Sequence, residues 1–229
     1  MNNKGRIKKA FLMSVPVLTG YICLGIGFGI VLESKGFGVL WSIAMGLFIY
    51  AGSMQYVAID LLTGGASLIA TALTTLMVNA RHLFYGISMI DKYKDVGRAK
   101  PYMIFALTDE TYSLVVSEES NDKRLYFLIS LFNHIYWVTG CALGGIIGSL
   151  ITFNTQGIDF ALTALFVTVF VEQWLTSKDH LSAIIGVVST VVCLVVFGSQ
   201  YFLIPSMVFI TLLLTVFKKY TIEEDKDNA

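Results

Sequence analysis

Residues 67–90, SLIATALTTLMVNARHLFYGISMI, form a run long and apolar enough to cross a bilayer, yet Arg81 lies near its middle. A guanidinium near the bilayer centre costs about 2.5–3.5 kcal/mol on insertion scales. In a regular helix Arg81 would lie about nine residues, or roughly 13 Å, from the nearer end, which is too far for easy snorkelling to water. We therefore expect an internal partner or a hydrated cavity at Arg81, and such a residue predicts a functional site.

The composition is that of a helical membrane protein. Of the 229 residues, 55% are hydrophobic and only 14% are charged, whereas about a quarter of the residues in a soluble domain are charged. The 16 basic and 16 acidic residues balance, so net charge gives no reason to expect a nucleic-acid partner. We predict an all-α, polytopic integral membrane protein with about six to eight hydrophobic segments.

The apolar segments are separated by short links, none of which is long enough to fold as a domain. They cover residues 11–32, 37–62, 67–90, 101–117, 125–150, 159–176, 181–198 and 203–217. Some glycines are spaced by four and form smooth helix faces, which we expect to pack within the chain, with a partner-subunit interface as the alternative. These glycines are Gly25 and Gly29, and Gly140, Gly144 and Gly148.

The distribution of basic residues constrains the membrane topology. Lys and Arg gather in four stretches, which the positive-inside rule places in the cytoplasm: 4–9, 92–100, 123–124 and 218–219. Eight simple crossings cannot satisfy this rule, because three crossings would put the second stretch outside. With two re-entrant segments, the N-terminus (1–10) and the tail (218–229) are both cytoplasmic, and Lys35 is the sole exception.

Two segments have the interruptions that re-entry requires. Segment 37–62 is interrupted around 51–53, at Ala51-Gly52-Ser53, and segment 101–117 is interrupted around 108–110, at Thr108-Asp109-Glu110. Segment 67–90, interrupted at residues 79–82, is the alternative to 37–62. Broken helices persist in a bilayer only where protein or water satisfies their backbone, and in transporters they mark substrate and ion sites.

The first candidate constellation is AGSMQYVAID, residues 51–60. Gly52 and Ser53 favour a helix break, and Ser53 is a candidate N-cap for the half-helix that follows. The start of a half-helix presents free N–H groups and a positive dipole end, which suits a carboxylate. Gln55 adds an amide. The alternative is a kinked helix whose polar groups satisfy one another.

The second constellation is NARHLFYG, residues 79–86. Asn79 and His82 share a helix face with Thr71 and Thr75, because they are three or four residues apart. Arg81 would point away from that face in a continuous helix. Either Arg81 faces a separate partner, or the helix breaks near Asn79.

The third constellation is TDETY, residues 108–112, with two adjacent carboxyls in an apolar segment. Placing two ionised carboxyls inside an apolar segment is energetically costly. We therefore predict that at least one is protonated or paired with Arg81. Adjacent helical residues point about 100° apart, so one carboxyl can pair while the other faces a cavity. A carboxyl that changes protonation there would couple a proton or bind a substrate ammonium group. The alternative is an amphipathic surface element in which Asp109 and Glu110 are solvated.

Signatures of enzymes and metal sites are missing. The sequence has no GxSxG, HExxH, Walker or CxxC motif, and the histidines at 82, 134 and 180 lack the spacing of metal ligands. We therefore expect no catalytic residue, no metal site and no cofactor. A passive channel for small solutes or ions remains an alternative, as does an intramembrane enzyme with Asp109 and His82 as acid and base.

Two stretches resemble the large subunit of AzlC-type branched-chain amino-acid exporters: GSMQYVAIDLLTGGASLIATALTTLMVNARHLFYGISM (52–89) and FALTDETYSL (105–114). The later WVTGCALGGIIG (137–148) and GIDFALTALFVTVFV (157–171) are similar to that family's second half. The resemblance implies one transport domain over residues 1–229 in the cytoplasmic membrane. It also implies export of leucine, isoleucine and valine, with methionine as a further candidate, and a small hydrophobic AzlD-type partner subunit.

The candidate residues by themselves are suited to binding an amino acid, which is less specific than what the resemblance implies. A zwitterionic amino acid needs a donor for its carboxylate, which Arg81 or the half-helix start at Gly52-Ser53 can supply. It also needs an acceptor for its ammonium group, which Asp109 or Glu110 can supply. The aromatic residues Tyr56, Phe84 and Tyr85 are candidates for an apolar pocket. Because no ATP site is present, we predict a gradient-driven secondary transporter, with proton antiport favoured by the two carboxyls.

Overall fold

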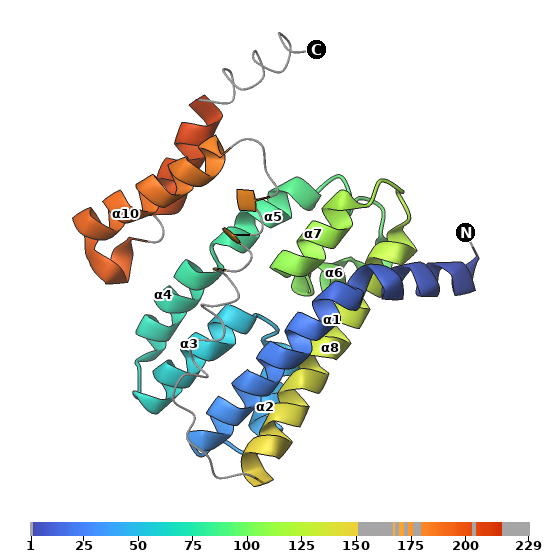
Figure 1. The fold of residues 1–229 in the computed structure, drawn as a ribbon, viewed down its shortest axis with the longest axis horizontal. Coiled ribbons are helices and arrows are strands. Elements are labelled where there is room, and N and C mark those ends of the chain that lie inside the picture. The colour runs from blue at the N-terminus through green and yellow to red at the C-terminus, as the bar shows by residue number, and fades with distance from the viewer. Residues whose placement is uncertain are drawn as a thin grey trace. The chain divides into compact units, whose positions relative to one another are not determined.

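The computed structural model describes residues 2–150, 167, 170–171, 174–175, 180–202 and 205–216, and all secondary structure in this part of the chain is helical (Figure 1). The all-α prediction is therefore confirmed. The chain divides into two compact units, Met1–Ala164 and Leu165–Ala229, which are described separately. The predicted tail at 218–229 lies outside the described residues, as does most of segment 159–176.

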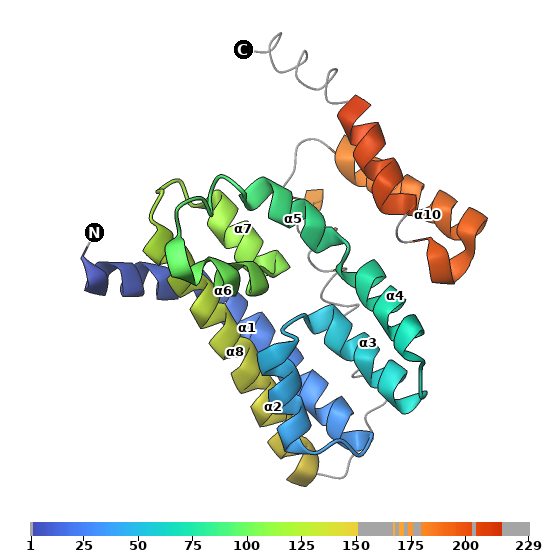
Figure 2. The same cartoon turned by 180° about the vertical axis from the view of Figure 1, so that it is seen from behind.

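Two long helices, α1 (Asn3–Ser34) and α8 (Lys123–Leu150), lie side by side and form the scaffold of the first unit (Figures 1 and 2). They approach closely at glycines. A Cβ added to Gly25 would lie 2.9 Å from Cys141 N, and one added to Gly140 would lie 2.8 Å from Tyr21 O. At Gly144 a Cβ would collide with the backbone of Ile26. The prediction that these glycine faces pack within the chain is confirmed.

Between α1 and α8 the chain forms three interrupted helix pairs. The first two are α2 (Val39–Phe48) with α3 (Gly52–Thr63), and α4 (Leu68–Asn79) with α5 (Arg81–Met89). The third is α6 (Lys100–Phe105), preceded by the 3-10 turn η1 (Gly97–Ala99), with α7 (Asp109–Ser117).

The interruption between α2 and α3 centres on Tyr50, whose φ of 44° lies in the left-handed region. A bulky residue rarely adopts this conformation. Tyr50 is only 3% exposed, and its ring is 4.3 Å from that of His134 on α8. The predicted break is confirmed, but it lies one or two residues earlier in the chain than residues 51–53. The predicted cap is wrong, because Ala51 occupies the N-cap position and makes no side-chain cap hydrogen bond. Ser53 instead accepts a hydrogen bond from Arg81.

The other two interruptions differ in kind. Between α6 and α7 the chain leaves the helix, and Thr108 caps α7 by accepting a hydrogen bond from the Thr111 N–H, so the predicted break at 108–110 is confirmed. Between α4 and α5, Ala80 keeps helical angles, φ −54° and ψ −32°. Segment 67–90 is therefore interrupted in addition to 37–62, not in place of it, and its interruption is the mildest.

Three helices within the described residues are long and apolar enough to cross a membrane: Asn3–Ser34, Lys123–Leu150 and Leu181–Ser199. Shorter apolar helices cover Val39–Phe48, Leu68–Asn79 and Pro205–Val216. These lengths fit broken elements between full spans. Whether the broken pairs re-enter from one side stays a prediction.

The second unit contains α10 (Leu181–Tyr201) and the helix Pro205–Val216. Gly198 interrupts the regular path of α10 with φ 73°, a conformation that glycine adopts without a Cβ penalty. Ahead of α10, the ring of His180 stacks on that of Trp174 at 4.3 Å between centroids.

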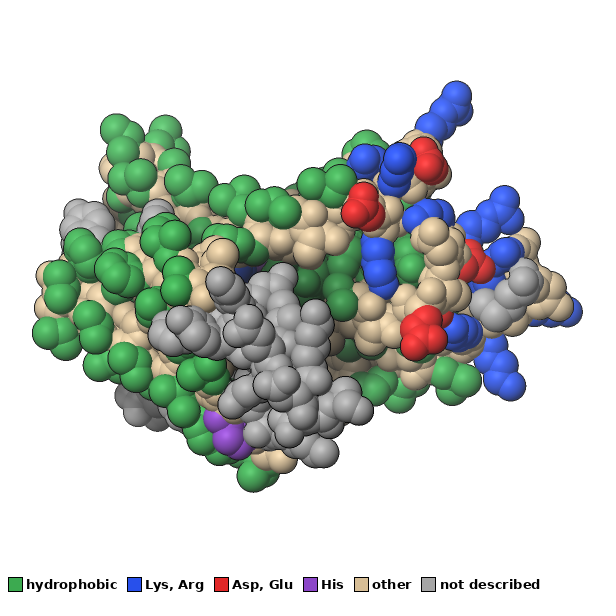
Figure 3. Space-filling view, turned by 90° about the horizontal axis from the view of Figure 1, so that it is seen from above, with side chains coloured by type: hydrophobic (Ala, Val, Ile, Leu, Met, Phe, Trp, Pro, Cys, Tyr) green, Lys and Arg blue, Asp and Glu red, His purple; other side chains and the backbone are tan. Residues whose placement is uncertain are grey.

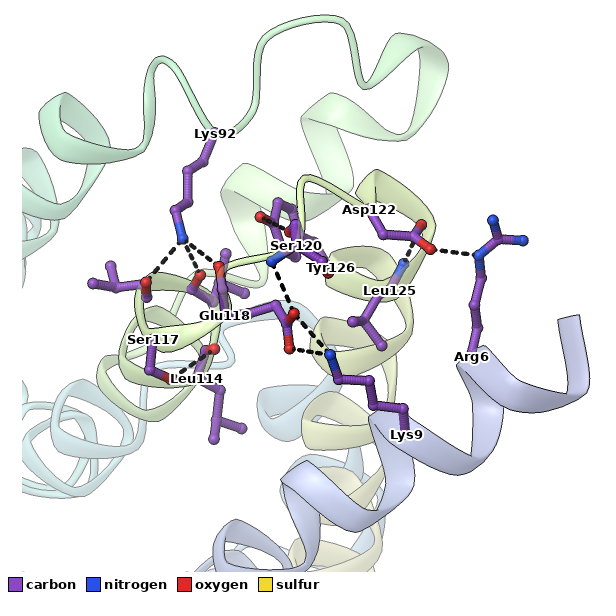
Figure 4. Close-up of polar contacts among 12 residues, drawn as sticks. Arg6, Lys9, Lys92, Leu114, Ser117, Glu118, Ser120, Asp122, Leu125 and Tyr126 are labelled. Carbon is purple, nitrogen blue, oxygen red and sulfur yellow. Dashed lines mark hydrogen bonds and ion pairs between the residues drawn. The ribbon is translucent and has the colours of Figure 1, made fainter. Parts of the chain in front are cut away.

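Within the first unit, basic side chains gather at one end with acidic side chains among them (Figure 3). In the first unit they join the start of α1 to the link between α7 and α8 (Figure 4). Arg6 Nε lies 2.6 Å from Asp122 Oδ2, and Lys9 Nζ lies 2.7 Å from Glu118 Oε2. Lys92 donates to three carbonyl oxygens near the end of α7, those of Val115, Val116 and Glu118. We call this set the basic end.

A prediction follows from the α1–α8 contact. Gly144→Ala places a methyl group against the backbone of Ile26, so we expect the free energy of unfolding to fall by about 1–3 kcal/mol, as in overpacked cores. The matched control is Gly20→Ala on α1, where a Cβ meets nothing within 4 Å. We expect this control to be neutral or stabilising by up to about 1 kcal/mol. Thermal unfolding in detergent measures both, and equal melting temperatures would contradict the packing.

A second prediction concerns pH at the basic end. Burial alone would raise the pKa of Glu118, but hydrogen bonds from Lys9 and Ser120 outweigh it and hold that pKa below 4.5. The hydrogen bond from Arg6 likewise holds the pKa of Asp122 below 3.8. Carboxyls whose pKa is depressed by folding stabilise above their unfolded pKa, and this stabilisation is lost as pH falls through the folded pKa.

We therefore expect the basic end to be fully stabilised at neutral pH and to weaken below about pH 4.5. Glu118→Gln should lower the free energy of unfolding at pH 7 by about 1 kcal/mol. The expected loss is small because the Lys9 side chain is 40% exposed, so solvent screens the ion pair. Thermal scans between pH 3 and pH 7 compare this variant with Glu119→Gln, at an exposed neighbour. If both variants follow the wild-type curve, the Lys9–Glu118 pair does not stabilise the fold.

Candidate functional site

The candidate site lies where three half-helices begin. Ser53 is the second residue of α3, Arg81 is the first of α5 and Asp109 is the first of α7. Arg81 Nη2 donates to Ser53 Oγ at 2.8 Å and lies 3.0 Å from Asp109 Oδ2. The positive dipole ends of α3 and α7, which begin after full breaks, therefore lie beside one ion pair. Both alternatives considered for Arg81 are realised: the helix is interrupted near Asn79, and Arg81 has an ion-pair partner.

The ion pair is accessible. The side chains of Arg81 and Asp109 are 28% and 30% exposed. Asp109 Oδ1 is buried among protein atoms and accepts no hydrogen bond from the described residues. A buried carboxylate oxygen without a donor is costly, and such an oxygen commonly marks a place for water or a ligand. The pair therefore offers a guanidinium and a carboxylate to a small polar molecule.

The two adjacent carboxyls have separate partners. Whereas Asp109 pairs with Arg81, Glu110 Oε2 accepts a 2.6 Å hydrogen bond from Tyr21 Oη on α1. Tyr21 Oη also lies 2.7 Å from Thr108 Oγ1. The prediction that one carboxyl pairs with Arg81 is confirmed, but Glu110 is tied to α1 and not left facing a cavity. This geometry does not fit a surface helix with two solvated acids.

A chain of hydroxyl groups leads from Glu110 to α8. Beyond Tyr21 and Thr108, the Thr108 hydroxyl lies 3.1 Å from Thr111 Oγ1, which accepts from Asn133 Nδ2 at 3.0 Å. Thr111 and Asn133 are fully buried. The chain ties the α6–α7 break to both scaffold helices.

Gln55 lies beside a neighbouring aromatic cluster. Its side chain is fully buried, and Oε1 accepts from Trp137 Nε1 at 2.7 Å. Trp137 packs edge-on against Tyr21 at 5.4 Å between ring centroids, and Tyr21 packs edge-on against Tyr50 at 6.5 Å. The aromatic cluster, formed by Tyr21, Tyr50, His134 and Trp137, joins α1, the α2–α3 break and α8. Gly52 lies against it, because a Cβ there would be 3.0 Å from the Trp137 ring.

The predicted polar face before Arg81 contributes little. The hydroxyls of Thr71 and Thr75 donate to carbonyls one turn back in their own helix, those of Ser67 and Thr71. His82 Nδ1 lies 3.2 Å from the Asn79 carbonyl oxygen. His82 therefore contacts the backbone of Asn79 at the α4–α5 interruption, whereas the buried Asn79 Oδ1 has no hydrogen-bond partner among the described residues.

The predicted apolar pocket is only partly assembled. Tyr56 donates to Leu24 O on α1 at 2.9 Å, and Phe84 is 40% exposed. Tyr85 alone is placed near the site, because its ring stacks at 4.5 Å on Tyr112 of α7. Across the described ranges, no three His, Cys, Asp or Glu side chains are grouped as metal ligands.

Sequence reasoning missed Tyr21, Tyr50 and Trp137. Tyr21 and Trp137 lie in the apolar runs that became α1 and α8, where an aromatic residue gives no signal of a polar role. Of these three residues, only Tyr50 could have been recognised as a candidate from the sequence, because it directly precedes the predicted break.

Comparisons with known proteins bear on the same residues. The AzlC protein family model matches residues 16–151, which contain all three interrupted pairs and the Arg81–Asp109 pair. The branched-chain amino acid transport protein AzlC of Bacillus subtilis is 44% identical, over 96% of this chain and 89% of the relative. An uncharacterized membrane protein of Helicobacter pylori strain 26695 is 41% identical, over 93% of this chain and 95% of the relative.

A more distant relative is the inner membrane protein YgaZ of Escherichia coli, 28% identical over 72% of this chain and 70% of the relative. No solved structure matches the chain. The resemblance expected from residues 52–89 and 105–114 is confirmed, together with the helical membrane-protein class. The chain belongs to the AzlC family.

Proposed function

We propose that the protein is the large subunit of a secondary transporter that exports branched-chain amino acids across the cytoplasmic membrane. The observation that carries the proposal is the Arg81–Asp109 pair, set at the start of three half-helices in a chain that is 44% identical to a branched-chain amino acid transport protein. Leucine, isoleucine and valine are the proposed substrates, with methionine as a further candidate.

The pair suits a zwitterion. A substrate carboxylate takes the place of Asp109 on the Arg81 guanidinium, assisted by the half-helix ends. The substrate ammonium group then pairs with the released Asp109 carboxylate. Before and after binding every charge has a partner, so the site exchanges an internal ion pair for two intermolecular ones and avoids an uncompensated charge. The Arg81–Ser53 hydrogen bond at 2.8 Å holds the guanidinium in position meanwhile.

The energy source in this proposal is a gradient, and proton antiport is the form favoured by the two carboxyls. Alternating access opens the pair to one side of the membrane and then to the other, with the interrupted helices as the parts that move. The N-terminus, the tail and the basic end face the cytoplasm, in agreement with the positive-inside rule.

The proposed partner is a small hydrophobic AzlD-type membrane subunit. No residue of α4 is buried, and many of the exposed side chains along α4 and α5 are large and apolar. They include Leu68, Ile69, Leu73, Leu76, Leu83 and Ile87. Such a surface suits a second apolar helix packing beside the site-bearing helices, and loss of transport when the small subunit is omitted tests this part of the proposal.

The function is tested by efflux of valine, leucine and isoleucine from cells preloaded with peptides that contain them. We expect the protein with its small subunit to speed efflux. Arg81→Gln should reduce that efflux about tenfold or more, because charge-assisted hydrogen bonds to the substrate carboxylate are lost. Arg98→Gln, at an exposed arginine in η1, is the matched control and should export like the wild type.

Each contradictory outcome has a distinct meaning at equal membrane abundance. Wild-type efflux from Arg81→Gln would make Arg81 a structural residue. No efflux from the wild type with its subunit would overturn the proposed function. Gradient-independent flux that does not saturate at millimolar substrate would favour a channel, and turnover by the purified protein in detergent would favour an enzyme.

A further inference from the structure

Two carboxyls that are adjacent in the sequence are held in different ways. Asp109 lies 3.0 Å from the Arg81 guanidinium, so its negative charge is balanced within the protein. Glu110 has no ion-pair partner among the described residues. It accepts a 2.6 Å hydrogen bond from Tyr21, a side chain that is 4% exposed. One carboxyl is thus a fixed anion, and the other is a partly buried acid beside a neutral hydroxyl.

This difference decides which carboxyl binds a proton at lower cost. Protonating Asp109 would leave the Arg81 guanidinium without its counter-charge inside an apolar segment, which is expensive. Protonating Glu110 removes an uncompensated charge from the same environment. A proton that has to enter and leave the site in each cycle therefore belongs on Glu110.

We propose that Glu110 carries the coupling proton and that Tyr21 links its protonation state to the α6–α7 break. This inference rests on the proton-driven transport proposed above and gives the two acids different roles. Asp109 stays ionised and serves Arg81 or the substrate ammonium group. Glu110 takes up a proton from one side of the membrane and releases it to the other.

The protonation state of Glu110 decides which neighbouring oxygen receives the hydroxyl proton of Tyr21. The single hydroxyl proton of Tyr21 has two oxygens within reach, Glu110 Oε2 at 2.6 Å and Thr108 Oγ1 at 2.7 Å. When Glu110 is ionised, Tyr21 donates to it. When Glu110 is protonated, its own O–H donates to Tyr21, and Tyr21 donates to Thr108. Protonation thus reverses the Glu110–Tyr21 hydrogen bond and turns the Tyr21 hydroxyl proton toward Thr108, the residue that caps α7.

Among the described residues of the first unit, the other titratable groups near Glu110 do not supply a competing cation. On other elements they are tyrosines: Tyr21 on α1, Tyr50 in the α2–α3 break and Tyr85 on α5. On α7 the neighbour is Asp109, whose charge Arg81 balances. The two histidines of the first unit lie one contact further out, His82 against Tyr85 and His134 against Tyr50.

The test uses the protein reconstituted in vesicles with its small subunit and two assays of radiolabelled valine. One assay measures net valine flux driven by a pH gradient. The other measures valine-for-valine exchange at equal pH on both sides, which needs no net proton movement. Glu110→Gln fixes the neutral state, so we expect it to lose gradient-driven flux and to keep exchange. Glu119→Gln, in the exposed link after α7, should retain both, and Asp109→Asn should lose both.

Tyr21→Phe provides the second variant. It removes the donor that favours ionised Glu110 without changing the size of the ring, so the pH dependence of net flux should move to higher pH by about one unit. Exchange should persist. A shift of this kind supports the inference even if Glu110→Gln fails to reach the membrane.

The outcomes separate this inference from the proposed function. Gradient-driven flux retained in Glu110→Gln would overturn the inference, because the proton would then travel elsewhere. Loss of both activities in Glu110→Gln with an unshifted pH profile in Tyr21→Phe would also overturn it and would assign Glu110 to substrate binding. A wild-type complex that exchanges valine but ignores the pH gradient would refute proton coupling and leave transport intact. No valine movement in either assay would refute the proposed function itself.

Discussion

The cost of placing one guanidinium inside an apolar segment organises the centre of this protein. Arg81 cannot readily reach water from the middle of residues 67–90, and a charge there needs compensation. The structure supplies it from α3 through Ser53 and from α7 through Asp109, at 2.8 and 3.0 Å. Both partners are at the start of half-helices, so the breaks in the helices and the placement of the charge are parts of one arrangement.

That arrangement depends on a close-packed scaffold. Half-helices bury little of their own surface, and α4 has no buried residue at all. The buried contacts come from α1 and α8, whose backbones approach at Gly25, Gly140 and Gly144. The same two helices carry Tyr21, Asn133 and Trp137, which hold the breaks through hydrogen bonds and ring contacts. Glycine packing on one part of the scaffold thereby fixes the geometry of polar groups on another.

Local chemistry explains which features could be predicted from the sequence. The breaks at 51–53 and 108–110 were recognisable because small and charged residues interrupt apolar runs, and the pairing of Arg81 with a neighbouring acid followed from the cost of burying it. The Ser53 cap was wrong because the left-handed Tyr50 ends α2 and leaves Ala51 as the N-cap, a detail of backbone geometry that residue type does not specify.

Long-range partners could not be predicted in this way. Glu110 and Tyr21 are 89 positions apart, and Gln55 and Trp137 are 82 positions apart. A tyrosine or tryptophan in an apolar helix has many possible neighbours, and only the packing of the half-helices α3 and α7 against α1 and α8 selects one.

The most direct test of the account is an experimental structure of the complex with valine bound. We expect the valine carboxylate to lie within hydrogen-bonding distance of the Arg81 guanidinium and the ammonium group to lie on Asp109, with the two side chains no longer in direct contact. Valine bound elsewhere, with the 3.0 Å Arg81–Asp109 pair intact, would contradict it.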